Sequence, residues 1–267
     1  MSSARKALIV RRRDIERDPR PAGGGFESLS LRFLPRLAGR GLGVFCVNTA
    51  ERVMGLTFDD GPNPEHTPRI LDVLAKHGVR ATFFVLASEA RRNPEVMRRI
   101  AEAGHEVALH GKDHQSLLTM GVGEALASIR AARHTVEGLT GEKVRLFRPP
   151  YGECTILQAL SIRAMGLDLV MWSSDGLDWL HDEESAIAGR ALSTVFPGSI
   201  LLLHDNRADP ETISQGEVLP TFDRALVTML ILQSLARDGY SVVPAGELLA
   251  GYQQVRSAAK DRMVALR

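Results

Sequence analysis

The 267-residue sequence has few cysteines, no long apolar run and almost no net charge. Its two cysteines, Cys46 and Cys154, exclude a disulfide-stabilised scaffold and a cysteine-rich zinc module, and they fit a reducing compartment. The longest apolar stretches, such as 225–232, are far shorter than the ~20 residues that a bilayer requires, so we expect no transmembrane span. With 33 basic and 32 acidic residues, the chain as a whole shows no preference for a polyanion, and we expect no binding to nucleic acid.

The first residues also lack the apolar core of a secretory signal. Only residues 7–10 are apolar before Arg11, Arg12 and Arg13 interrupt the run, whereas a signal peptide needs about 7–15 apolar residues. We therefore expect a cytoplasmic protein.

Charge divides the chain near residue 50. Residues 1–40 carry ten basic and four acidic side chains, and the rest of the chain is acidic overall. We predict a basic, partly flexible N-terminal arm over residues 1–49 and a single folded domain over residues 50–267. Apolar residues of the segment 26–47 are interleaved with arginines, so this segment either packs on the domain or makes a peripheral contact with an anionic membrane surface.

Strands and helices are expected to alternate from residue 53 onward. The predicted strands are 53–58, 81–86, 106–109, 144–147, 167–172, 200–203 and 240–243. The predicted helices are 68–77 (with Thr67 as its N-cap), 94–103, 122–139, 156–165, 183–195, 222–237 and one from 245. Near-continuous apolar strands between helices indicate a parallel sheet covered by helices. Seven or so such units close, or nearly close, a barrel, and an open doubly wound sheet is the alternative.

Side chains capable of chemistry follow five of the predicted strands. Each group stands at the carboxyl end of its strand, where the loops of an α/β barrel converge on one rim. The five groups are Asp59-Asp60, His110 with His114, Arg148-Pro149-Pro150-Tyr151, Asp175 with Asp178 and Trp179, and Leu202 with His204.

The residue types in these groups suit metal-assisted hydrolysis. His110 and His114 are four apart, so on one helical turn they would face the same way and could share a metal ion with an Asp. Asp59 and Asp60 leave a strand together, so their side chains are expected to point to different sides. Each group also has a simpler interpretation, as turn-capping aspartates, surface histidines, a structural arginine or a core histidine.

Taken together, the five groups resemble the polysaccharide deacetylase family, also called the NodB homology domain or carbohydrate esterase family 4. All five motifs of that family occur here in order, within residues 50–250. The resemblance implies a distorted (β/α) barrel of seven or eight units, with residues 50–267 as its catalytic domain. It also implies one divalent metal ion, zinc or alternatively cobalt, nickel or manganese, held by Asp60, His110 and His114.

The resemblance further implies a role for each remaining motif residue. Asp59 would be the general base that acts on metal-activated water, and His204 would be the general acid. Arg148 would hold Asp59, and Asp178 would tune His204. The substrate would be bound by the backbone N–H of Tyr151 at the oxyanion, by Trp179 and Leu202 around the acetyl methyl group, and by the loop at Pro149.

The implied function is hydrolytic removal of an acetyl group from an N-acetylated sugar, glycoside or glycolipid. One departure from the family pattern concerns the metal, because Gly111 stands where the family has Ser or Thr and removes a hydroxyl near the ligands. One alternative is hydrolysis of another C–N bond, in a cyclic imide or ureide. A second alternative is a non-catalytic carbohydrate-binding module.

Overall fold

The parallel sheet is the centre of the structure. The computed structural model describes residues 8–9, 42–206 and 220–257. Its main sheet has the strand order β7-β6-β5-β4-β3-β9-β8, with β10 beside β3, and all of its pairings are parallel. The strands are β3 (Val53–Asp59), β4 (Thr82–Leu86), β5 (Glu106–Gly111), β6 (Leu146–Phe147), β7 (Asp168–Leu169), β8 (Ser174–Asp175), β9 (Ile200–His204) and β10 (Ser241–Val243).

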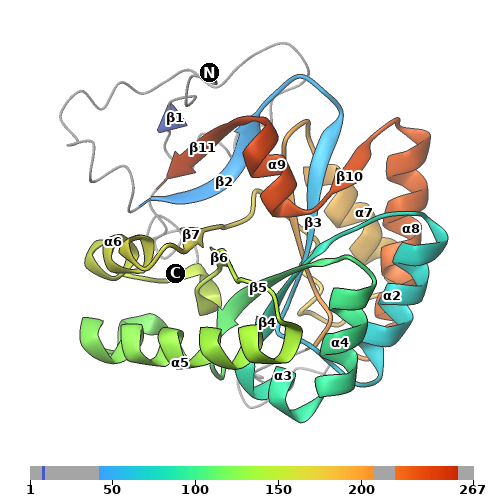
Figure 1. Cartoon of the computed structure of the whole chain (residues 1–267). Coiled ribbons are helices and arrows are strands. Elements are labelled where there is room, and N and C mark those ends of the chain that lie inside the picture. The colour runs from blue at the N-terminus through green and yellow to red at the C-terminus, as the bar shows by residue number, and fades with distance from the viewer. Residues whose placement is uncertain (1–7, 10–41, 207–219, 258–267) are drawn as a thin grey trace.

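Helices surround this curled sheet on its outer side (Figure 1). They are α2 (His66–Lys76), α3 (Ala87–Arg92), α4 (Pro94–Glu102), α5 (Val122–Thr140), α6 (Ile156–Ala164), α7 (Glu184–Thr194) and α8 (Arg224–Arg237). The last helix, α9 (Ala245–Gly251), covers the amino end of the barrel instead. Two short 3-10 turns, Leu117–Thr119 and Pro150–Gly152, lie in the loops. The predicted distorted (β/α) barrel is confirmed as a single α/β unit whose sheet curls into a half-barrel.

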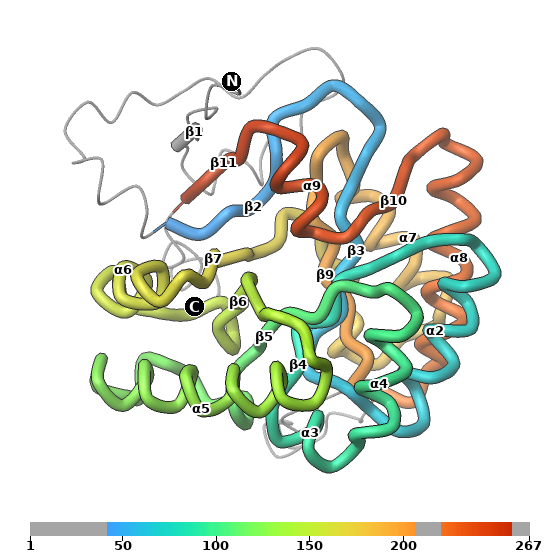
Figure 2. Tube along the Cα trace, in the orientation of Figure 1, coloured from blue at the N-terminus to red at the C-terminus, as the bar shows by residue number. Residues whose placement is uncertain are grey.

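A small second sheet fills the gap that the main sheet leaves open. β2 (Gly43–Asn48) pairs antiparallel with β11 (Gln253–Ser257), and β1 (Leu8–Ile9) pairs with the other edge of β11. The N–H of Met171, just after β7, donates to the carbonyl of Val44 at 2.7 Å. The N–H of Val47 donates to the carbonyl of Gly198, just before β9, at 2.9 Å. β2 therefore connects two segments that lie far apart along the main sheet (Figure 2).

Successive side chains of β3 point alternately to the apolar core under the helices and to the inside of the barrel. All seven residues of this strand are buried. Leu56 and Phe58 belong to the cluster that the helices cover, together with Ile70 of α2. The intervening residues, Thr57 and Asp59, face the opposite way, because successive side chains of a strand point to opposite faces. Polar groups thus lie inside the barrel while the apolar ones anchor the strand.

Several local predictions differ from the structure. The prediction of Thr67 as N-cap is wrong, because Thr67 lies inside α2 and Asn63 Oδ1 accepts the N–H groups of Glu65 and His66 at 2.8 and 2.9 Å. The predicted strand 167–172 is reduced to the two residues of β7, followed by a single bridge from Val170 to Val44. The sequence analysis missed α3, β8 and the pair β2 and β11. These elements are too short, or too far apart in the chain, to leave a periodic signal.

Within residues 8–9, 42–206 and 220–257, no helix has the length and apolarity needed to cross a bilayer. Most of the predicted arm, residues 1–7 and 10–41, lies outside the described residues. The boundary at residues 49 and 50, the membrane contact of the arm and the cytoplasmic location stay predictions. β2 lies on the arm side of that boundary.

Gly198 offers a test of how β2 closes the barrel. Gly198 has a φ of 86°, and a Cβ there would lie 2.3 Å from the carbonyl oxygen of Val47. Gly78 has a φ of 63°, but a Cβ there would meet nothing within 4 Å. Either Gly→Ala change costs about 1 kcal/mol of folding stability, because alanine disfavours the left-handed backbone conformation. We expect G198A to lower the free energy of unfolding further than G78A in chemical denaturation, and equal losses would contradict the closing role of β2.

Candidate active site

Polar side chains from separate strand ends meet at the carboxyl rim of the barrel. Asp59 ends β3, His110 lies in β5, Arg148 directly follows β6, and His204 ends β9. Asp178 follows β8 by three residues. All of these side chains are buried or nearly so, and the ion pairs described below join them.

Asp60, His110 and His114 bring three ligand atoms together. The Nε2 atoms of both histidines lie 3.3 Å from Asp60 Oδ1, and the candidate ligand atoms all fall within 4.8 Å of one another. His110 Nδ1 lies 2.8 Å from the carbonyl oxygen of Arg148, which only an N–H can satisfy, so Nε2 is the nitrogen that faces Asp60 and that would give its lone pair to a metal ion. One carboxylate oxygen and two imidazole nitrogens are the donor set of a catalytic zinc site with open positions, so these residues fit a divalent ion.

The charge state of Asp60 also suits a cation. Burial by itself raises the pKa of this carboxyl group. The hydrogen bond from His110 and the charges of His204, His114 and His110 outweigh burial and hold the pKa of Asp60 well below its usual range. Asp60 is therefore ionised at neutral pH, as a ligand of a divalent cation would have to be.

The two histidines do not lie on a helical turn, so that part of the sequence prediction is wrong. His110 is in β5 and His114 lies in the following loop with a φ of 57°. Gly111 between them has a φ of 121°, a conformation that L residues rarely adopt. A sharp reversal of the backbone therefore replaces the helical turn. Glycine at this position is explained by that conformation, although it leaves the site without the hydroxyl group expected there.

Arg148 is fully buried and holds Asp59 from inside the barrel. Its Nη1 donates to Asp59 Oδ1 at 2.6 Å and to the Thr57 hydroxyl at 2.9 Å. Its Nε and Nη2 donate to the carbonyl oxygens of Val170 and Met171 at 3.1 and 2.9 Å. The guanidinium also lies over an aromatic ring, with 4.1 Å from its carbon to the ring centre of Phe84. Asp59 is thereby fixed, with its second oxygen 3.8 Å from His110 Nε2.

His204 is oriented by Asp178 on the other side of the rim. Asp178 Oδ1 lies 2.6 Å from His204 Nδ1, and Asp178 Oδ2 accepts the backbone N–H of His204 at 2.8 Å. Arg224 Nη1 donates to Asp178 Oδ2 at 3.2 Å and to the His204 carbonyl oxygen at 2.8 Å. Burial opposes protonation of His204, but Asp178 foremost, then Asp60 and Asp59, raise the pKa of His204 to about 9. The imidazole is therefore protonated at neutral pH. Burial raises the pKa of Asp178, but His204 foremost and then Arg224 outweigh burial and lower it.

The four expected substrate-binding residues have different surroundings. Tyr151 is half-exposed, has a φ of 58°, and packs its ring edge-on against His114 at 4.5 Å between centres. Trp179 is 45% exposed, on the loop after β8. Leu202 is only 4% exposed, in an apolar cluster inside the barrel, and Pro149 is buried beside Arg148.

Three residues to which the sequence analysis gave no role are part of this arrangement. Thr57 accepts a hydrogen bond from Arg148, and Arg224 donates one to Asp178, as described above. Asp205 is buried, accepts the Thr67 hydroxyl at 2.5 Å and donates its N–H to the Asp59 carbonyl oxygen at 3.2 Å. Burial and then Asp60 raise the pKa of Asp205 to about 7. In the sequence, only its position directly after His204 indicated that Asp205 lies near the site.

Backbone strain is concentrated at the rim. Among the described residues, four that are not glycine have a positive φ. They are Asp60, His114, Tyr151 and Leu177, and the last precedes Asp178. Such conformations cost about 1–3 kcal/mol each and persist where the surrounding structure enforces them, typically at functional sites.

The chain is similar to known deacetylases. A family model described as polysaccharide deacetylase matches residues 47–170. A chitooligosaccharide deacetylase of Sinorhizobium fredii is 42% identical over 151 residues, which make up 56% of this chain and 70% of that protein.

Two solved structures share the fold. The Bc1960 peptidoglycan N-acetylglucosamine deacetylase matches with a TM-score of 0.68 at 30% identity, over 78% of this chain and 93% of that one. A CE4 family pseudoenzyme from Bacillus anthracis matches with a TM-score of 0.65 at 26% identity, over 74% of this chain and 65% of that one. The half-barrel is thus common to active and inactive proteins, so the side chains of the rim have to carry any argument about activity.

The buried pair of Arg148 and Asp59 leads to a stability prediction. Removing one partner of a buried ion pair costs about 3–5 kcal/mol, because the other charge is left without compensation. We expect R148M to lower the free energy of unfolding by that amount. The double variant D59N/R148M should lose less than the sum of the two single variants in a double-mutant cycle by chemical denaturation. Additive losses would show that the two charges do not depend on each other.

Proposed function

The chain belongs to the polysaccharide deacetylase family, and from that premise we propose that it is a metal-dependent hydrolase that deacetylates an N-acetylated sugar or glycoconjugate. The observation that carries the proposal is the pair of separately held proton-transfer groups beside one candidate metal site. Asp59 is held by Arg148 at 2.6 Å, and His204 is held by Asp178 at 2.6 Å. A protein that only binds sugar has no need for a base and an acid kept in different charge states.

The roles of the residues follow from their contacts. A divalent ion bound by Asp60, His110 and His114 would polarise the acyl carbonyl group and lower the pKa of water. We assign zinc to this site because of its nitrogen and oxygen donors, and cobalt, nickel or manganese could take its place. Arg148 holds the Asp59 carboxylate in place beside the candidate metal site, and Asp59 is the proposed acceptor of a proton from water.

His204 completes the proton transfers. An amine is a poor leaving group until it is protonated, and His204 holds a proton at neutral pH because its pKa is raised to about 9. Asp178 occupies Nδ1, which leaves Nε2 as the nitrogen that gives its proton to the leaving amine. The backbone N–H of Tyr151, in its left-handed conformation, is the proposed donor to the oxyanion, and Trp179 and Leu202 are the proposed acetyl-binding side chains.

The relatives suggest where to look for the substrate. The Sinorhizobium fredii relative is named for chitooligosaccharides, and the Bc1960 structure for peptidoglycan N-acetylglucosamine. We therefore propose a β-linked N-acetylglucosamine unit, in an oligosaccharide or a glycoconjugate, as the group from which acetate is removed.

Acetate release tests the proposal. Zinc-loaded protein should release acetate from a panel of chitin oligosaccharides, peptidoglycan fragments, free and nucleotide-linked N-acetylglucosamine and a lipid-linked N-acetyl sugar. D59N should lower turnover by about 100- to 10,000-fold, the usual share of a general base, while zinc content and sugar binding stay unchanged. Bound zinc without acetate from any sugar, together with turnover of a cyclic imide, would favour the other C–N hydrolase. Sugar binding with neither zinc nor turnover would favour a binding module.

Asp178 provides a second test through the pH profile. His204 acts while protonated, so activity should fall as pH rises through the pKa of His204. Asp178 is the main group that raises this pKa. In D178N the pKa of His204 should fall, and the alkaline limb of the kcat/KM profile should move to lower pH. An alkaline limb at the same pH in both proteins would contradict the role of His204 as the acid.

A further inference from the structure

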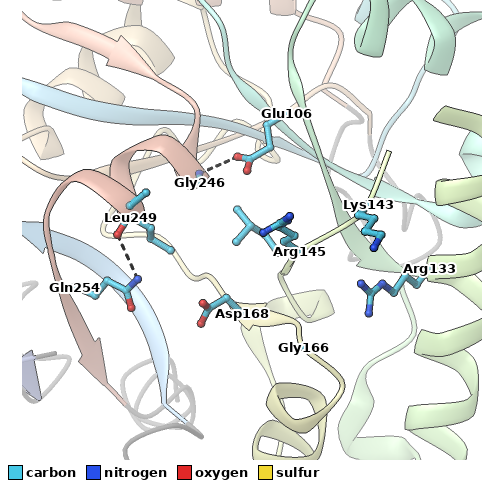
Figure 3. Close-up of a pocket in the computed structure, with 11 residues that line it drawn as sticks. Glu106, Arg133, Lys143, Arg145, Gly166, Asp168, Gly246, Leu249 and Gln254 are labelled. Carbon is cyan, nitrogen blue, oxygen red and sulfur yellow. Dashed lines mark hydrogen bonds between the residues drawn. The ribbon is translucent and has the colours of Figure 1, made fainter. Parts of the chain in front are cut away.

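A cavity of about 600 Å³ lies at the end of the barrel opposite the candidate active site. It is lined by residues at the amino ends of β5, β6 and β7 and by residues of α9 and β11 (Figure 3). Strand β5 connects the two places, because Glu106 at its start lines the cavity and His110 near its other end is a candidate metal ligand. A cavity of this volume falls within the range of small-molecule sites.

Three cationic side chains line one part of this cavity: Arg133, Lys143 and Arg145. Arg133 is held by Glu137 Oε1 at 2.8 Å and by the carbonyl oxygen of Met165 at 3.0 Å. The same Glu137 oxygen accepts the N–H of Val144 at 3.0 Å, which fixes the segment that carries the other two cations. The side chains of Lys143 and Arg145 form neither an ion pair nor a hydrogen bond with any residue that the structure describes.

The carboxylates of the cavity do not pair directly with Lys143 or Arg145, because they bind other groups. Asp168 Oδ1 accepts Arg256 Nη2 at 2.8 Å and also pairs with Arg163. Glu106 Oε2 accepts the Thr82 hydroxyl at 2.6 Å and the N–H of Gly246 at 2.8 Å.

The charge balance is therefore positive. The charged lining residues and their ion-pair partners comprise five cations and three carboxylates, an excess of two positive charges. The cations are Arg133, Lys143, Arg145, Arg163 and Arg256, and the carboxylates are Glu106, Glu137 and Asp168.

We propose that this cavity binds a phosphate monoester, with Lys143 and Arg145 as its principal partners. A phosphate monoester carries about −1.5 to −2 charges at neutral pH and offers three strong acceptor oxygens, which match the positive excess and the two cations without partners. The remainder of the ligand would lie against Leu249 and Gln254, which line the other side of the cavity (Figure 3). The phosphate belongs either to a soluble sugar phosphate or to a lipid headgroup. Phosphate binding at this cavity does not depend on the deacetylase activity.

Calorimetry on the full chain tests this site. The probes are glucose 6-phosphate, glucose, inorganic phosphate, and vesicles with phosphatidic acid or with phosphatidylcholine alone. The variant K143Q/R145Q removes both cations, and K76Q/R130Q is the matched control. Lys76 and Arg130 are also exposed and have no hydrogen-bond or ion-pair partner among the described side chains.

The proposal predicts saturable binding of glucose 6-phosphate or of phosphatidic acid vesicles, according to the source of the phosphate. K143Q/R145Q should weaken this binding by at least about tenfold, since hydrogen bonds to charged groups are strong, whereas K76Q/R130Q should not change it. Acetate release should be the same in all three proteins when no phosphate is present. Equal binding of glucose, equal losses in both double variants, or no saturable binding of any phosphate probe would overturn the proposal.

Discussion

The buried contact between Arg148 and Asp59 is the interaction on which the rest of the site depends. Arg148 reaches from the end of β6 to Thr57 and Asp59 of β3, and it also binds the backbone carbonyls that follow β7. A fully buried guanidinium is costly unless its donors are satisfied, so these partners have to stay in place together. The same side chain therefore holds strands of the half-barrel together and separates two neighbouring aspartates. Asp59 forms an ion pair with Arg148, whereas Asp60 lies beside His110 and His114.

Two further features of the rim follow from this division. The carbonyl oxygen of Arg148 accepts His110 Nδ1, so the residue that fixes the candidate base also sets the tautomer of a candidate metal ligand. His204 and Asp178 form a second pair across the rim, locked by Arg224. The rim thus holds a carboxylate stabilised by a cation and an imidazolium stabilised by a carboxylate. In the proposed reaction, that difference in environment would let Asp59 accept a proton and His204 donate one at the same pH.

Most of the barrel, and the groups on its rim, could be predicted from the sequence, because buried parallel strands and their polar carboxyl ends leave a regular pattern. The spacing of His110 and His114 indicated a shared site, but the strand and the reversal at Gly111 could not be foreseen from spacing alone. Arg224 was missed because it lies in the first turn of a long apolar helix and reaches Asp178 only through the fold. β2 and β11 were missed because their pairing joins residues some two hundred positions apart, a contact that no local pattern encodes.

We propose that Asp60, His110 and His114 bind the metal while Arg148 keeps Asp59 from binding it. X-ray absorption spectroscopy of the zinc-loaded full chain and of D59N tests it most directly. We expect two imidazole nitrogens and oxygen donors around the zinc, identical in both proteins, and the loss of one imidazole in H114A. A first shell that changes in D59N, or one without two imidazoles in the unaltered protein, would contradict it.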